Sequence, residues 1–233
     1  MNKLKFIVTF IFLSFYFHQD LFARNPISSN RFEELSGIRG SNSSKDTKYQ
    51  WDKKYNQEQY VYGKGPATFL RENLHFLKVG GRILDMGMGE GRNAVYLATK
   101  GFQVIGVDIS SVAVKKADSL AKENKVKVET VIADLTSYKL PKNSLDGIIC
   151  FYFVDRSLVE KMQGWLRPGG VIIYEAYTDN QRKIKGFEHF NKNYLLHEGE
   201  LINLFKGFHV LKYEEPLMTN SFTSSLVAQK PKL

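Results

Sequence analysis

Two carboxylates and three glycines early in the chain are spaced as groups that can hold one small ligand. Asp85 stands directly before a loop in which Gly87, Gly89 and Gly91 alternate with larger residues, and Asp108 follows about one helix later. Glycines adopt positive φ angles and let a ligand approach the backbone. A carboxylate at a strand end can accept hydrogen bonds from ribose hydroxyls. Because both acids flank the loop, the pattern predicts a nucleoside that carries a cationic tail.

These residues need a particular set of elements to position them. The apolar segment 82–84 predicts a buried strand before the loop, and 104–107 predicts a second strand that ends at Asp108. Between them, apolar residues recur with helical spacing up to Gly101, a natural helix stop. A strand, glycine loop, helix and strand in this order direct helix N–H groups and a strand-end carboxylate towards one ligand.

The glycine spacing bears on which ligand is bound. The dinucleotide fingerprint is G-x-G-x-x-G, and Arg92 stands where its third glycine would fall. Asp85 is also badly placed for a nearby pyrophosphate. Both features argue against a dinucleotide. An NAD-dependent oxidoreductase is kept as the alternative interpretation, together with a nucleoside-binding module that has no catalytic activity.

The loop resembles motif I of the class I S-adenosylmethionine-dependent methyltransferases, because Asp-x-Gly-x-Gly-x-Gly is present in full. From Trp51 onwards the chain is most similar to the tellurite-resistance and thiopurine type of small-molecule methyltransferase. Five segments carry this resemblance, namely 60–66, 89–94, 107–110, 133–135 and 166–170. Met88 departs from the Cys or Ser that is usual in that family.

The resemblance implies a cofactor, S-adenosylmethionine, and a set of cofactor-binding residues. The glycines would surround the methionine portion, with Asp85 near its ammonium group and Arg92 near its carboxylate. Asp108 would accept from the ribose hydroxyls, and Tyr62 would fold over the mouth of the site. The adenine would be contacted by four residues, Ile109, Ala133, Asp134 and Leu135.

Composition limits the other classes of function. The chain of 233 residues is 43% hydrophobic and 24% charged, which is typical of a globular protein. Its net charge of +9 is spread over lysines without an aromatic-rich basic stretch, so nucleic acid is not the favoured partner. The single cysteine, Cys150, lies in an apolar run and is expected to be buried and inert. The histidines lack zinc-like pairing with cysteines, and no metal site is expected.

The N-terminal region divides into two parts before the domain. Residues 1–23 carry early lysines, a short apolar run and Ala23, which resembles a secretory signal or a membrane anchor. A mis-assigned start codon is the third interpretation of this segment. Residues 24–50 are rich in Ser and Asn and are interpreted as a linker, and 51–233 as the methyltransferase domain. Export or anchoring conflicts with a cofactor made in the cytoplasm, so the location stays open. Only residues 1–23, if uncleaved, would contact a membrane.

The remaining sequence alternates strands and helices until two closing strands, 209–213 and 224–229, which have no helix between them. The expected fold is α/β and doubly wound: a Rossmann-like seven-stranded sheet, mostly parallel with an antiparallel last strand and with helices on both faces. We expect a monomer that methylates a small molecule, of the thiol or chalcogen oxyanion type. The sequence does not identify a catalytic base, although four residues are possible pocket groups, Tyr62, Glu175, His189 and His197.

Overall fold

The computed structural model describes residues 44–217 and 220–232. The signal-like segment 1–23 and most of the expected linker lie outside the described residues. Residues 44–50, expected to belong to the linker, form the start of helix α2 (Ser44–Tyr55). This helix has little apolar periodicity of its own. It is held by tertiary contacts instead, because Asp52 accepts hydrogen bonds from Ser110 Oγ at 2.7 Å and from the Val112 N–H at 3.2 Å.

Seven strands form one sheet in the order β3-β2-β1-β4-β5-β7-β6. Neighbouring strands from β3 to β5 are parallel, whereas β7 is antiparallel to both β5 and β6. The expected doubly wound sheet with an antiparallel last strand is therefore confirmed. The strands are β1 (Arg82–Met86), β2 (Gln103–Asp108), β3 (Glu129–Ile132), β4 (Leu145–Phe151), β5 (Leu166–Tyr177), β6 (His209–Glu214) and β7 (Thr223–Gln229).

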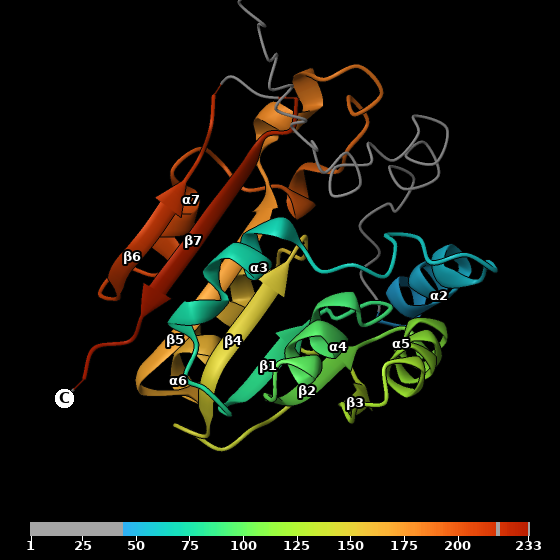
Figure 1. The fold of residues 1–233 in the computed structure, drawn as a ribbon. Helices are drawn as coiled ribbons and strands as arrows, with labels where there is room; N and C mark the ends of the chain where they lie inside the picture. The colour runs from blue at the N-terminus through green and yellow to red at the C-terminus, as the bar shows by residue number, and fades with distance from the viewer. Residues whose placement is uncertain (1–43, 218–219, 233) are drawn as a thin grey trace, which may run out of the picture.

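Helices cover both faces of the sheet (Figure 1). One face carries α3 (Thr68–Asn73), α4 (Arg92–Thr99) and α5 (Ser111–Glu123), and the other carries α6 (Val159–Trp165) and α7 (Glu200–Leu204). Short 3-10 turns occur at Leu74–Phe76, Arg156–Leu158, Asp179–Lys183 and Lys192–Tyr194. No helix in the described part of the chain is long and apolar enough to span a membrane.

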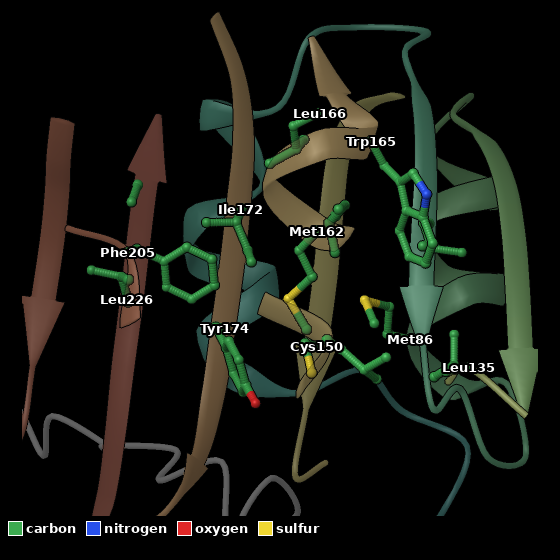
Figure 2. Close-up of a cluster of buried hydrophobic side chains, with 14 of the residues drawn as sticks. Met86, Leu135, Cys150, Met162, Trp165, Leu166, Ile172, Tyr174, Phe205 and Leu226 are labelled. Atoms are coloured by element: carbon green, nitrogen blue, oxygen red, sulfur yellow. The ribbon is translucent and has the colours of Figure 1, made fainter. Parts of the chain in front are cut away.

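The alternation of strand residues produces two separate cores. In β1, Ile83 packs with α3 and α4, whereas Leu84 and Met86 point into the core on the opposite face. That second core includes Cys150, Trp165 and side chains of α6 and α7 (Figure 2). Cys150 is fully buried, and burial raises the pKa of its thiol. The expected burial of this cysteine is confirmed.

Strands β3 and β5 differ most from what the sequence predicts. The apolar run 126–133 predicts one strand, but β3 covers only Glu129–Ile132, because its register with β2 begins at Ile105 and ends at Asp108. The apolar run 171–174 predicts a strand that follows the Pro-Gly-Gly turn, but β5 already begins at Leu166, which pairs with Leu145 of β4.

The departure at Met88 is accommodated inside the fold. Met88 is buried against Val114 and Ala117 of α5, and its side chain lies over Gly106 in the middle of β2. A Cβ atom at position 106 would lie 2.1 Å from Met88 Sδ. The bulky loop residue therefore requires a glycine in the neighbouring strand.

Gly106→Ala is expected to lower the free energy of unfolding by about 1–3 kcal/mol, because the added methyl group overpacks this contact. In a Met88→Ala background the same substitution should cost clearly less, since the clashing sulfur is gone. Urea unfolding of the four proteins measures this coupling. An equal cost in both backgrounds would contradict the proposed packing.

Candidate functional site

The glycine loop has a backbone that only glycine adopts easily. Gly87, Gly89 and Gly91 have φ angles of 65°, 55° and 81°, all in the left-handed region. A Cβ atom at Gly91 would lie 2.6 Å from that of Ala117 in α5, so a side chain there has no room. The loop is closed by the Met88 N–H, which donates to the Val107 carbonyl at 3.1 Å. The structure thus places the three predicted glycines in one tight turn at the carboxyl edge of the sheet.

Asp108 connects this loop to the start of α5. Its carboxylate is buried at the end of β2 and accepts from the Gly89 N–H and the Ser110 N–H, both at 2.8 Å. Burial raises the pKa of Asp108, and these two hydrogen bonds oppose the rise. Each oxygen keeps a lone pair for a further donor. Ser110 in turn caps α5 by accepting from the Ala113 N–H at 3.1 Å.

Asp85 is a buried carboxylate near the end of β1. It is 2% exposed, and among the described residues its Oδ2 atom has no hydrogen-bond partner. Burial raises the pKa of Asp85 to about 7, while the positive charge of Arg92 acts in the opposite direction. A buried acceptor without a donor costs free energy in the folded state. The position therefore suits a ligand that supplies a cationic donor.

Arg92 is the cation closest in sequence to this loop, at the first turn of α4. Among the residues described, its side chain forms no hydrogen bond or ion pair. Its guanidinium carbon lies 6.0 Å from the ring centroid of Tyr62 and 5.7 Å from that of Tyr152. An arginine held between aromatic rings with its donors unused can bind an anionic group.

The segment after α2 carries Tyr62 to the glycine loop. Glu90 of the loop accepts from the Val61 N–H at 2.7 Å and pairs with Lys116 at 2.6 Å. Asn93 Oδ1 accepts from the Ala67 N–H at 2.8 Å. Sequence reasoning missed these structural roles, because neither residue has a spacing that indicates a partner almost thirty residues away.

Lys54 is a third residue whose role the sequence did not indicate. It donates to the hydroxyl of Tyr62, and its Nζ atom lies 4.2 Å from the ring centroid of Trp51. Burial lowers the pKa of Lys54 to about 7, although the charges of Glu90 and Asp108 act against this shift. The last turn of α2 thus places an ammonium group and aromatic rings over the predicted site.

The predicted adenine-contacting residues are close to the same edge, but Asp134 has a local role as well. The Ala133 N–H donates to the Asp108 carbonyl at 3.0 Å, which places 133–135 beside the end of β2. Asp134 Oδ1 accepts from both the N–H and the hydroxyl of Thr136, at 2.8 and 2.6 Å. This is a turn-forming arrangement that needs no ligand. Ile109 is half-buried and Leu135 is buried.

Of the four possible pocket groups, Tyr62 and Glu175 lie near Arg92, Tyr62 directly and Glu175 through Tyr152. His189 is exposed, and His197 pairs with Asp179 through Nδ1 and Oδ2 at 2.5 Å. Glu175 is buried and accepts from Tyr152, the residue whose ring faces Arg92. Groups of three or more metal-ligating side chains are absent from the described parts of the chain.

Comparison with known proteins agrees with this geometry. Residues 83–170 match the family model of the methyltransferase domain. A probable S-adenosyl-L-methionine-dependent methyltransferase TehB of Haemophilus influenzae is 24% identical over 142 residues, which cover 58% of this chain and 48% of that sequence. Phosphoethanolamine N-methyltransferase 1 of Zea mays is 32% identical over 113 residues, 46% of this chain and 23% of that sequence. The chain thus spans less than half the length of these curated relatives.

Solved structures share the fold. An S-adenosylmethionine-dependent methyltransferase of Methanosarcina mazei superposes with a TM-score of 0.58 at 20% identity, covering 69% of this chain and 97% of that one. Agreement over nearly the whole of the second chain confirms the arrangement of the sheet.

The raised pKa of Asp85 has a consequence for stability that requires no ligand. The native state binds this proton more tightly than the unfolded chain does, so the free energy of unfolding should rise as the pH falls below 7. When the pH is lowered from about 8 to about 5, the free energy of unfolding of the wild type should increase by on the order of 3 kcal/mol relative to that of Asp85→Asn. Urea unfolding at each pH measures the difference. If the free energies of unfolding of the wild type and the variant differ by the same amount at every pH, the pKa of Asp85 is not raised in the native state.

Proposed function

We propose that the chain is a class I S-adenosylmethionine-dependent methyltransferase related to TehB and that it transfers the cofactor's methyl group to a small-molecule acceptor. The observation that carries the proposal is the carboxylate oxygen of Asp85 beside the glycine loop, which has no hydrogen-bond partner within residues 44–217 and 220–232. The α-ammonium group of the cofactor is a donor of the charge and size that this oxygen lacks.

The residues present fit the cofactor along its length. Asp85 would accept from the ammonium group, Arg92 would bind the carboxylate, and Asp108 would accept from the ribose hydroxyls. Tyr62, which is positioned by its contact with Lys54, would close over the methionine portion. The adenine would lie against Ile109 and the 133–135 segment, with Asp134 sharing its carboxylate between the ligand and the Thr136 turn.

The bound cofactor supplies an activated methyl group on a positively charged sulfur. This chain's residues then have to hold the acceptor in line with that methyl group at contact distance. Restricting the motion of two reactants in this way contributes up to about 7–11 kcal/mol in well-oriented systems. The Tyr55 hydroxyl lies against the loop, 2.9 Å from where a Cβ atom on Gly89 would be, and Trp51 and Tyr62 pack in the same cluster as Tyr55. These aromatic side chains would exclude water from the reacting atoms.

A thiol or a chalcogen oxyanion is the acceptor type we favour. Support comes from the sequence resemblance to tellurite-resistance and thiopurine-type enzymes and from the similarity to TehB. The similarity to phosphoethanolamine N-methyltransferase 1 adds amines as a second candidate class. All of these acceptors are small molecules.

Two other functions predict different binding. An NAD-dependent oxidoreductase requires a pyrophosphate beside the loop, where this chain has the buried acid Asp85. A cofactor-binding module without catalysis would bind S-adenosylhomocysteine and methylate nothing.

We expect the chain to bind S-adenosylhomocysteine and not NAD in calorimetric titrations. With S-adenosylmethionine it should methylate at least one member of a panel of thiols, amines and chalcogen oxyanions, detected by mass spectrometry. Binding of NAD in preference to the nucleoside would overturn the proposal. Tight nucleoside binding with no turnover on the panel would favour the non-catalytic module.

Asp108→Ala should weaken binding of S-adenosylhomocysteine by at least about 100-fold, because two charge-assisted hydrogen bonds to the ribose are lost. The substitution also releases the Gly89 N–H, so Asp134→Ala serves as the control and should weaken binding less. Calorimetry measures both affinities, and circular dichroism checks that both variants fold. Unchanged affinity in a folded Asp108→Ala protein would disprove its role.

A further inference from the structure

Tyr152 has a backbone conformation that its side chain disfavours. It follows β4 directly and has a φ angle of +57°, in the left-handed region that bulky residues rarely occupy. Such strain persists only where the surroundings impose it, and it concentrates at functional sites. The next residue, Phe153, lies against the glycine loop, since a Cβ atom on Gly87 would be 2.9 Å from its ring. The strained residue is therefore adjacent to the predicted cofactor site.

In this conformation the Tyr152 hydroxyl points towards Glu175. The Tyr152 N–H donates to the Glu175 carbonyl at 2.7 Å, and its hydroxyl donates to Glu175 Oε1 at 2.7 Å. Ser225 Oγ donates to Glu175 Oε2 at 2.9 Å. Glu175 is 8% exposed, whereas Tyr152 remains 40% exposed. One end of this pair is thus buried and the other is open to a ligand.

Charged and aromatic groups surround the pair from several elements. Arg92 of α4 lies over the ring of Tyr152, and Tyr177 of β5 stands with its ring centroid 5.0 Å away. Burial raises the pKa of Glu175; the hydrogen bonds from Tyr152 and Ser225 and the charge of Arg92 lower it, and the charge of Glu214 adds to the rise. A buried carboxylate with a raised pKa is suited to accept a proton near neutral pH.

We propose that Tyr152 and Glu175 remove the proton from a protic methyl acceptor, a thiol, amine or hydroxyl, with Tyr152 as the catalytic residue and Glu175 as its positioning residue and final proton acceptor. The inference rests on the proposed methyl transfer and narrows its acceptor class. Because the Tyr152 hydroxyl donates to Glu175, its oxygen is free to accept from the acceptor's X–H group.

The step balances. The acceptor's lone pair forms a bond to the methyl carbon while the bond from that carbon to the cofactor sulfur breaks, and its electron pair stays on sulfur. The X–H proton passes to the Tyr152 oxygen as the Tyr152 proton passes to the Glu175 carboxylate. A chalcogen oxyanion already has a free lone pair and would not use this relay.

The test compares Tyr152→Phe and Glu175→Gln with Tyr49→Phe, a control at a residue that is 71% exposed on α2. The probes are 2-mercaptoethanol, which is protonated at neutral pH, and 4-nitrothiophenol, which is ionised. With 2-mercaptoethanol we expect kcat to fall at least about 100-fold in both variants. With 4-nitrothiophenol it should change less than about threefold, as should the affinity for S-adenosylhomocysteine.

The pH profile separates proton transfer from a purely structural role. With 2-mercaptoethanol the wild-type kcat should rise as Glu175 ionises, and this acid limb should vanish in Glu175→Gln, which keeps the hydrogen bond. Ser225→Ala removes a hydrogen bond that lowers the pKa of Glu175, so the limb should move to higher pH. Infrared difference spectra between the wild type and Glu175→Gln provide a readout without turnover. They should contain a protonated carboxyl band that titrates above the usual glutamate range, while the bands of Asp85 and Asp108 cancel.

Several results would overturn the inference. Equal losses with both thiols would assign the pair a structural role, and an unshifted acid limb or carboxyl band would show that Glu175 does not take the proton. A wild type that binds S-adenosylhomocysteine but methylates only oxyanions, or neither thiol, would refute the acceptor class. Failure to bind S-adenosylhomocysteine at all would instead refute the proposed function.

Discussion

The structure depends on the burial of two carboxylates, Asp85 and Asp108, at the edge where β1 and β2 end. Taking a charge out of water costs several kcal/mol unless donors replace the lost hydration. Asp108 receives two backbone donors, whereas one oxygen of Asp85 receives none among the described residues. The protein thus keeps a buried acid whose cost is offset either by a proton or by a cationic ligand, and a ligand that also brings hydroxyl groups would satisfy Asp108.

The other elements can be understood from this constraint. Left-handed glycines bring backbone N–H groups close to Asp108, and Gly106 leaves space for Met88 beneath the loop. Glu90 fastens the segment before α3 to the loop, and Asp52 fastens α2 to the start of α5. These two anchors hold the aromatic cluster around Tyr55 beside the glycine loop. The strained Tyr152 directly follows β4, so the proposed cofactor and acceptor sites would both lie at the carboxyl edge of the sheet.

The sequence predicted the local unit well because each of its signals is local. Alternating glycines, strand-end acids and helical spacing are sufficient to predict β1 to α5 and the residues around them. Contacts between distant segments left no such trace. The hydrogen bond from Ser110 to Asp52 attaches α2 to the start of α5, and the pairing of Tyr152 with Glu175 depends on the register of β4 against β5. Periodicity also could not show that one carboxylate oxygen of Asp134 accepts hydrogen bonds from Thr136.

The most direct measurement is a crystal structure with S-adenosylhomocysteine bound. The account predicts the ligand's ammonium nitrogen within hydrogen-bond distance of Asp85 Oδ2 and its ribose hydroxyls on the carboxylate of Asp108. An empty cleft under saturating ligand, or a nucleotide pyrophosphate seated against Gly87 and Gly89, would contradict it.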